Sequence, residues 1–272
     1  MRIFAAVVLF GLLSAPVHAQ GTGLKRLNTG DDTRGWEGVG RLDVAGKGFC
    51  TGALIAPDLV LTAAHCLFDR ATGKRVDHET IEFRAGWRDG RASAYRDIRR
   101  AVVHPDYDYD GSTTTERVRN DLALLELSRP IRTTEVTPFE TSERPRTGDE
   151  IGVVSYALDR AEAPSLQEIC HVMARQQGVL VMSCDVNFGS SGAPIFRVDK
   201  YGTPKIVSVV SAKAEAQGVP VSLGTALASP LARLRAELAA GSNRFQAPQN
   251  VSTQGVVATR RGNIGAKFIR PD

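Results

Sequence analysis

Short apolar segments separated by turn residues recur along most of the chain, and this pattern predicts β-strands. A turn signal such as Ala56-Pro57-Asp58 divides two neighbouring segments. The predicted strands of the first half are 49–55, 59–62, 81–86, 101–104 and 122–127. Those of the second half are 150–156, 167–173, 179–183, 193–196, 205–211 and 223–227. The pattern therefore predicts an all-β protein in two similar halves, joined by a connector at 128–146 that contains three prolines.

Only one segment has a convincing helical period. Leu231, Leu234 and Leu238 are spaced i, i+3 and i+7, and Gly241 follows them. This spacing predicts a helix over 230–240, with Ser229 as its N-cap. The segment 241–272 lacks such a period and is expected to be mobile. Residues 20–35, rich in Gly, Thr, Asp and Arg, are expected to be poorly ordered or loosely attached.

The first residues have the features of a secretory signal. An apolar run from Ile3 to Leu13 follows Arg2, and it is too short to span a bilayer. Val17 and Ala19 provide the small residues that precede a cleavage site. We therefore expect a signal peptide at 1–19 and a secreted or periplasmic protein, and no later segment is long enough for a membrane span.

Secretion changes how the four cysteines are interpreted, because an oxidising compartment favours disulfides over zinc ligands. Four cysteines allow three pairings. The two local pairs, Cys50 with Cys66 and Cys170 with Cys184, are our expectation, although spacing alone does not decide among the three.

Composition and charge exclude few functions. The chain has 272 residues, of which 42% are apolar and 6% aromatic, as in a soluble globular protein. The net charge is +4, and the tail after Gly241 holds five basic residues against Asp272, so the rest is close to neutral. A solvated basic tail is a poor indication of nucleic-acid binding. We expect no nucleic-acid partner and a monomer.

Three stretches carry residues suited to acyl transfer. The Gly-rich turn Asn187-Phe188-Gly189-Ser190-Ser191-Gly192 places a serine at a loop tip, beside backbone N–H groups that could stabilise an oxyanion. His65 stands between Ala64 and Cys66, where a disulfide would hold it as a general base must be held. Asp121 leads into an apolar strand, where its charge is costly unless paired.

Together these stretches resemble the chymotrypsin-like (trypsin-type) serine proteases. The matching motifs are Leu-Thr-Ala-Ala-His-Cys, Asp-Leu-Ala-Leu-Leu and Gly-x-Ser-Gly-x-Pro, in the family's order, and the resemblance covers about residues 38–240. It implies two six-stranded antiparallel β-barrels with an active site in the cleft between them. It also implies peptide-bond hydrolysis through an acyl-enzyme, without a cofactor. By motif, His65 is the base and then the acid, Asp121 orients it, and Ser191 is the nucleophile. Gly189 and Ser191 would provide the oxyanion N–H groups.

The resemblance also divides the chain. The protease domain would occupy 36–240, with barrel 1 at about 36–130, the connector at 128–146, barrel 2 at about 147–228 and the helix at 230–240. Most animal members have an aspartate immediately before the nucleophile, which pairs with a newly cut N-terminal amine. Here that position is Ser190, so this activation switch is expected to be absent. This feature looks more like the bacterial secreted branch that includes the glutamyl endopeptidases. Removal of a pro-segment at Arg26 or Arg34 is left open.

Three residues bear on specificity. Asp185 lies six residues before Ser191, where an acidic residue at the base of the pocket would select Arg or Lys. Lys213 could lie in the pocket wall, near Ser211, and neutralise that charge. The residue before Ser211 is Val210, where glutamate-selecting relatives place a histidine, so a glutamate preference is disfavoured. We interpret Asp185 as selecting basic residues before the cut. The alternative is that Lys213 neutralises Asp185 and so removes this preference.

Other kinds of site fit the sequence less well. The aspartates 106, 108 and 110 imitate the start of a calcium loop, but Arg117 stands where its glutamate ligand is required. His78, His104 and His171 lack the spacing of a zinc site, so no metal is expected. The favoured function is a secreted serine endopeptidase acting on proteins or peptides. The alternatives are an inactive, protease-like binding protein and an esterase on the same fold.

Overall fold

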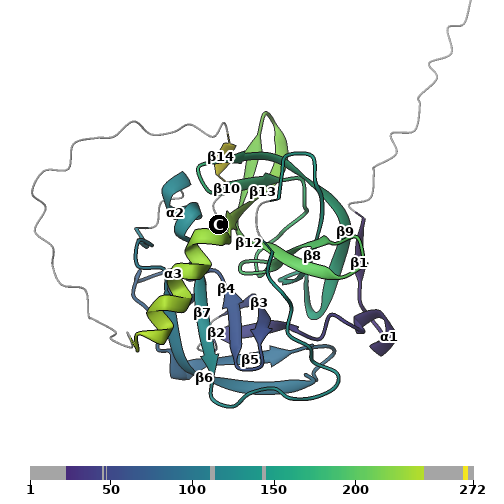
Figure 1. Cartoon of the computed structure of the whole chain (residues 1–272), viewed down its shortest axis with the longest axis vertical. Coiled ribbons are helices and arrows are strands. Elements are labelled where there is room, and N and C mark those ends of the chain that lie inside the picture. The colour runs from purple at the N-terminus through teal and green to yellow at the C-terminus, as the bar shows by residue number, and fades with distance from the viewer. Residues whose placement is uncertain are drawn as a thin grey trace, which may run out of the picture.

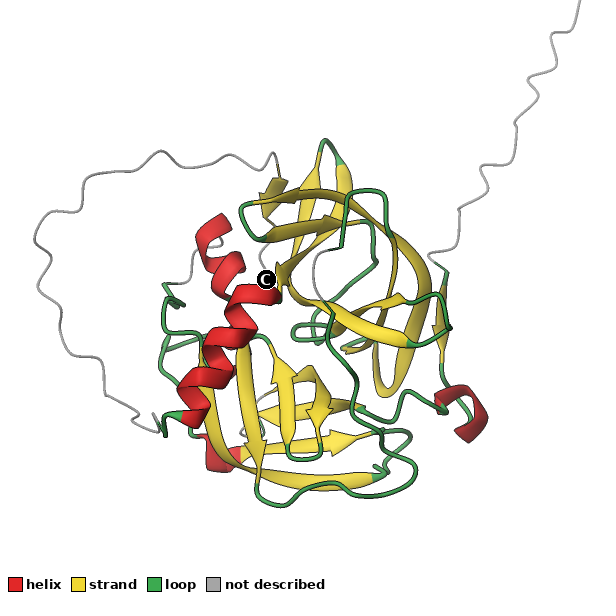
Figure 2. Cartoon of the chain, in the orientation of Figure 1, coloured by secondary structure: helices red, strands yellow, loops and turns green. Residues whose placement is uncertain are grey.

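The computed structural model describes residues 23–241, apart from 45, 47, 111–113 and 143–144, and the backbone of residues 266–268. The predicted signal peptide and most of the predicted tail lie outside these residues. Strands dominate the described chain, and Figures 1 and 2 show two groups of strands with one longer helix along their side. Within the described ranges, no helix has the length and hydropathy to cross a membrane.

Barrel 1 is a closed antiparallel barrel in the order β2-β3-β4-β7-β6-β5. Its strands are β2 (Val39–Val44), β3 (Gly48–Ala56), β4 (Leu59–Thr62), β5 (Ile81–Ala85), β6 (Ala94–Val103) and β7 (Ala123–Leu127). In β5, Ile81, Phe83 and Ala85 are buried while the residues between them are half-buried. This alternation is what one core-facing side of a strand requires.

Barrel 2 closes in the same way, because β8 pairs with both β9 and β11 in the ring β8-β9-β10-β13-β12-β11. Its strands are β8 (Glu150–Ala157), β9 (Arg160–Gln176), β10 (Val179–Met182), β11 (Pro194–Val198), β12 (Pro204–Ala216) and β13 (Val219–Ala226). The prediction of two six-stranded antiparallel barrels is confirmed.

The other elements are short, apart from one helix. They are β1 (Leu24–Arg26), α1 (Gly30–Thr33), the 3-10 helices η1 (Ala64–Leu67) and η2 (His78–Thr80), α2 (Thr115–Asn120), α3 (Ala228–Ala239) and β14 (Ala266–Phe268). β1 pairs with β9, and β14 pairs with β12, so both add to barrel 2 from outside its ring. α3 buries Leu231 and Leu234 and contacts β6 and β7 of barrel 1.

The core is divided unequally between the barrels. The largest buried apolar cluster fills barrel 1 and continues into the junction, where it includes Tyr156 and Phe196 of barrel 2. Rings of Trp36 and Phe139 pack on Phe196 at centroid distances of 5.0 and 4.8 Å. A second cluster lies within barrel 2 and includes the Cys170–Cys184 disulfide. Both predicted disulfides are formed, the other being Cys50–Cys66.

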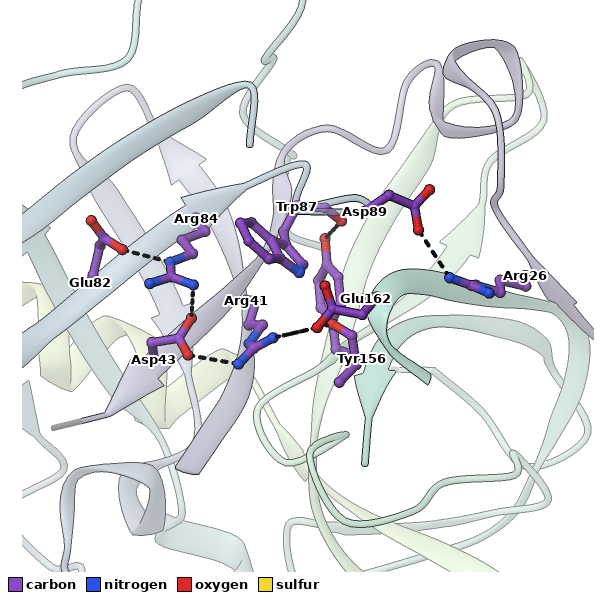
Figure 3. A network of polar contacts seen from close by, with 10 residues as sticks. Arg26, Arg41, Asp43, Glu82, Arg84, Trp87, Asp89, Tyr156 and Glu162 are labelled. Atoms are coloured by element: carbon purple, nitrogen blue, oxygen red, sulfur yellow. Dashed lines mark hydrogen bonds and ion pairs between the residues drawn. The ribbon is translucent and has the colours of Figure 1, made fainter. Parts of the chain in front are cut away.

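Polar contacts also join the barrels along one side of the junction (Figure 3). Arg41 of β2 reaches the carboxylate of Glu162 in β9, and it is paired with Asp43 at 2.8 Å in its own strand. The Tyr156 hydroxyl donates to the Trp87 carbonyl oxygen at 2.9 Å. Tyr156 is completely buried, so this bond satisfies its polar group inside the junction.

Three sequence expectations need correction. The segment before residue 36 is not loosely attached in its described part, because β1 pairs with β9 and Leu27 is 1% exposed. Ser229 is not the N-cap of α3, since the helix begins at Ala228 after Leu227, whose side chain makes no capping bond. The tail is not wholly without structure either, since residues 266–268 form β14; its other residues lie outside the described ones.

Candidate active site

His65 lies on η1, directly after β4 of barrel 1, next to the disulfide that binds Cys66 to Cys50 of β3. Its backbone N–H donates to Oδ1 of Asp121 at 2.9 Å, and its Nδ1 lies 2.7 Å from Oδ2. A carboxylate can only accept, so Nδ1 carries the proton in this pair. The second ring nitrogen, Nε2, is then the basic one. The side chain is 14% exposed, which leaves it partly accessible.

Asp121 follows α2 and precedes β7, and its side chain is 3% exposed. Besides the two contacts with His65, it accepts a hydrogen bond from the hydroxyl of Ser211 in β12. Burial by itself would raise the pKa of Asp121, but the His65 and Ser211 contacts outweigh it and hold the pKa below its ordinary value. Asp121 is therefore a buried carboxylate that stays charged.

Ser191 stands on the irregular turn before β11, half-buried, and this turn is held from barrel 1. The Thr51 N–H of β3 donates to the Ser191 carbonyl at 2.8 Å, and the Thr51 hydroxyl donates to the Gly189 carbonyl at 2.9 Å. Gly189 has φ +98°, and a Cβ there would lie 2.5 Å from the Phe49 ring. Only glycine suits both its conformation and this contact.

The turn lies between the segments that carry His65 and Ser211. Gly192, with φ +79°, packs so closely that a Cβ would lie 2.1 Å from Oγ1 of Thr62, three residues before His65. On the other side, its N–H donates at 2.8 Å to the carbonyl of Val210, the residue before Ser211. The backbone beside Ser191 is thus fixed against both segments that hold the histidine–aspartate pair.

The free donors of this turn are the two N–H groups expected from the sequence. The Ser190 N–H donates to the Asn187 carbonyl, and the Gly192 N–H is used by Val210. Among the described residues, the N–H groups of Gly189 and Ser191 meet no acceptor, so both are available to an outside oxygen. Two such donors on one turn fit the geometry of an oxyanion hole.

Comparison with known proteins identifies the family. A sequence profile described as Trypsin matches residues 30–229, well over half of the chain. The chain belongs to the trypsin family. Curated relatives include a trypsin of Phaedon cochleariae, 37% identical over 84 residues, which are 30% of this chain and 29% of the relative. Another is a glutamyl endopeptidase of Bacillus licheniformis, 25% identical over 150 residues, 55% of this chain and 45% of the relative.

A solved structure of a Glu endopeptidase shares the fold. Its TM-score is 0.65 at 19% identity, over 80% of this chain and 97% of the other. The glutamyl endopeptidase relative supports a likeness to the bacterial branch of the trypsin family, and the solved structure shows the shared fold. The chain spans about a third of the trypsin and less than half of the glutamyl endopeptidase that it matches.

In this trypsin-family chain, the residue before Ser191 contacts a half-buried cation. Ser190 is fully buried, and its hydroxyl donates to the Ser155 hydroxyl at 3.1 Å. Nη2 of Arg160, a side chain that is 11% exposed, lies 3.5 Å from Oγ of Ser190 and 3.4 Å from Oγ of Ser155. Sequence reasoning missed Arg160 because Asp159-Arg160 has the composition of an exposed hairpin turn.

The specificity residues predicted from the sequence separate into two groups. Ser211 donates a hydrogen bond to Asp121, so it belongs to the same cluster as the triad candidates. Asp185 and Lys213 are both half-buried, and the Asp185 N–H donates to Oε1 of Gln167 at 2.7 Å. Within the described chain, no ion pair joins Asp185 to Lys213, so the proposed neutralisation has no direct contact behind it.

One cluster has metal-ligand atom types, namely Cys50, His65 and Cys66, whose ligand atoms lie within 4.8 Å of one another. Both sulfurs belong to the disulfide, and they cannot act as thiolate ligands in that state. These short distances instead mean that the His65 ring lies beside the disulfide, which helps to fix the position of the ring.

Proposed function

We propose that the chain is a secreted serine endopeptidase that hydrolyses peptide bonds through an acyl-enzyme. The observation that carries this proposal is the bonded set of His65, Asp121 and Ser211. The Ser191 turn contacts the segments that carry this set at Thr62 and Val210. Membership of the trypsin family supports it, as do relatives named as proteases.

The mechanism assigns one task to each residue. Nε2 of His65 takes the proton of the Ser191 hydroxyl as its oxygen attacks the substrate carbonyl. The carbonyl oxygen becomes negative and accepts hydrogen bonds from the Gly189 and Ser191 N–H groups. His65 then gives its proton to the leaving amine, the C–N bond breaks, and an ester to Ser191 remains. Water, activated by His65, hydrolyses this ester. Asp121 holds the ring and stabilises its positive charge during both steps.

The substitution Ser191→Ala tests the mechanism, because it removes the nucleophile and leaves the turn intact. We expect peptidase activity to fall by a factor of about 10³ or more, with unchanged thermal unfolding. A fluorophosphonate probe should label the unsubstituted protein and not the variant. Equal turnover in the two proteins excludes the mechanism. A folded, mature protein that never reacts with the probe favours the binding protein, and comparison of matched peptide and ester substrates tests the esterase.

For specificity, we propose a preference for Arg or Lys before the cut, carried by Asp185. A half-buried carboxylate in the pocket would attract a substrate cation, and no described cation is paired with it. A panel of short peptides that differ only in the residue before the cut tests this preference. Faster cleavage after Arg than after Leu or Phe is expected. If Leu or Phe is preferred, the role of Asp185 is wrong.

Secretion is part of the proposal and rests on the signal-like residues 1–19 and on the two disulfides. N-terminal sequencing and intact mass of the mature protein test it. We expect the mature chain to start at Gln20 or after a cut at Arg26 or Arg34.

A further inference from the structure

Arg70 lies at the candidate site but has no part in the mechanism described above. It belongs to the turn after η1, five residues beyond His65, and its side chain is exposed. The turn is well defined, because the Asp69 N–H donates to the Lys74 carbonyl and the Gly73 N–H donates to the Asp69 carbonyl, both at 2.8 Å. Oδ1 of Asp69 also accepts from the N–H groups of residues 71 and 72. The arginine is therefore presented by a structured turn.

The Arg70 guanidinium reaches across the junction to barrel 2. Its carbon Cζ lies 5.7 Å from the centroid of the Phe188 ring, a cation–π distance. Phe188 directly precedes Gly189, whose N–H is one of the two free donors. A guanidinium held on a ring keeps N–H donors at its edge, where they can bind a carboxylate in a bidentate way.

The charge of Arg70 is not neutralised within the described chain. No carboxylate of the described residues forms an ion pair with it. Gly189 has a second aromatic neighbour, Phe49, and the arginine on that ring differs from Arg70 in its exposure and ion pairing. Arg41 stacks on Phe49 at 4.4 Å, but it is 15% exposed and paired with Asp43 and Glu162. Of these two arginines, Arg70 alone has its charge available to a ligand.

The chemistry of the site decides which half of a substrate would meet Arg70. His65 must reach the leaving nitrogen to protonate it, so the leaving half passes on the His65 side of the scissile bond. The candidate acyl-side residues Asp185 and Lys213 belong to barrel 2, whereas Arg70 follows His65 in barrel 1 and covers the ring beside Gly189. The leaving half therefore runs past the arginine.

We propose that Arg70 is a specificity-determining residue that selects substrates with an acidic side chain shortly after the scissile bond. The inference rests on the proposed function. Exposed ion pairs contribute little to the free energy of binding. We therefore expect kcat/KM to be roughly two- to fivefold higher for an acidic residue than for an isosteric neutral one. Salt should reduce this preference, because the contact is solvent-exposed.

Internally quenched peptides that share one acyl half, with Glu, Gln or Lys in the first two positions after the cut, test the inference. The unsubstituted protein should cleave the Glu peptide faster than the Gln peptide, and Arg70→Gln should bring their ratio to about one. Arg70→Lys should retain part of the preference, and Arg70→Glu should favour the Lys peptide. Arg235→Gln is the matched control, because Arg235 is exposed on α3 and no described carboxylate pairs with it. This control should keep the original ratio.

Two results would overturn the inference while leaving the proposed function in place. One is an unsubstituted protein that cleaves all three peptides equally while still reacting with the fluorophosphonate. The other is a Glu-to-Gln ratio that survives in Arg70→Gln. If no peptide is cleaved and Ser191 is never labelled, the proposed function fails, and the inference fails with it.

Discussion

Barrel 1 supplies both His65 and Asp121, which contact each other directly, whereas barrel 2 presents Ser191 on a turn that hydrogen-bonds to both barrels. His65 and Asp121 both belong to barrel 1 and meet twice, at 2.9 and 2.7 Å. The turn of Ser191 has two residues with positive φ, Gly189 and Gly192, and Thr51 of barrel 1 donates to it twice. The histidine–aspartate pair thus forms within barrel 1, with a further hydrogen bond to Asp121 from Ser211 of barrel 2, and the turn of Ser191 is held by both barrels.

The apolar cores of the two barrels also differ in how far they extend. The cluster that fills barrel 1 extends through the junction, while the interior of barrel 2 has a cluster of its own. A substitution that disturbs the junction should therefore change the position of the Ser191 turn more than that of the His65–Asp121 pair, whose two mutual contacts lie within barrel 1. Three substitutions test this comparison.

Gly192→Ala should break the contact between the turn and barrel 1. The new Cβ would lie 2.1 Å from Thr62 Oγ1 and 2.3 Å from the Thr51 carbonyl oxygen, at φ +79°. We expect a loss of about 3 kcal/mol in the free energy of unfolding, from overpacking and backbone strain together. Urea unfolding measures it.

Gly202→Ala is the control for this prediction, because Gly202 has φ +82° but open space around it. Only the backbone strain applies there, so we expect a loss of about 1 kcal/mol. Equal losses in the two variants would mean that the contact with Thr62 and Thr51 contributes nothing.

Arg160→Met should affect turnover more than folding, because Arg160 contacts Ser190 from behind the turn. We expect kcat to fall about tenfold, with little change in KM, since a misplaced oxyanion donor weakens only the transition state. Arg160→Lys, which keeps a cation, should recover part of the loss. Steady-state kinetics and thermal unfolding together decide. An unchanged kcat with a lower unfolding temperature would show a purely structural role.

Tyr156→Phe removes one hydrogen bond across the junction and leaves the Trp87 carbonyl without this donor. We expect a loss of about 1 kcal/mol in the free energy of unfolding. Tyr201→Phe, at a residue that is 79% exposed, should change the stability very little. A Tyr156 variant as stable as this control would argue against the importance of the polar contacts in the junction.

Most strands were predictable because their apolar residues are local in sequence. β2 was missed, since it contains Gly40, Arg41 and Asp43 and does not look apolar. Its charges are accommodated by pairing across to β5, where Arg84 lies 3.2 Å from Asp43. Arg84 and Asp43 are 41 residues apart in the sequence, so their pairing cannot be recognised from a local pattern.

The candidate site shows the same limit. His65, Asp121 and Ser191 could be found because each lies in a distinctive short motif. The contacts of Arg160 with Ser190 and of Thr51 with the turn of Ser191 are made between distant segments, and neither residue stands out locally. The N-terminal segment was misjudged for a related reason, because β1 obtains its order from β9 and not from its own composition.

The position of β1 has a practical consequence for shortened forms of the protein. Residues 165–167 of β9 have β8 on one side and β1 on the other. In a chain starting after Arg26, residues 165–167 of β9 would have no partner strand on one side, and their backbone groups there would be unpaired beside the buried Leu27. Open strand edges recruit other strands, so preparations lacking the first 26 residues should self-associate at concentrations where the longer chain stays dispersed.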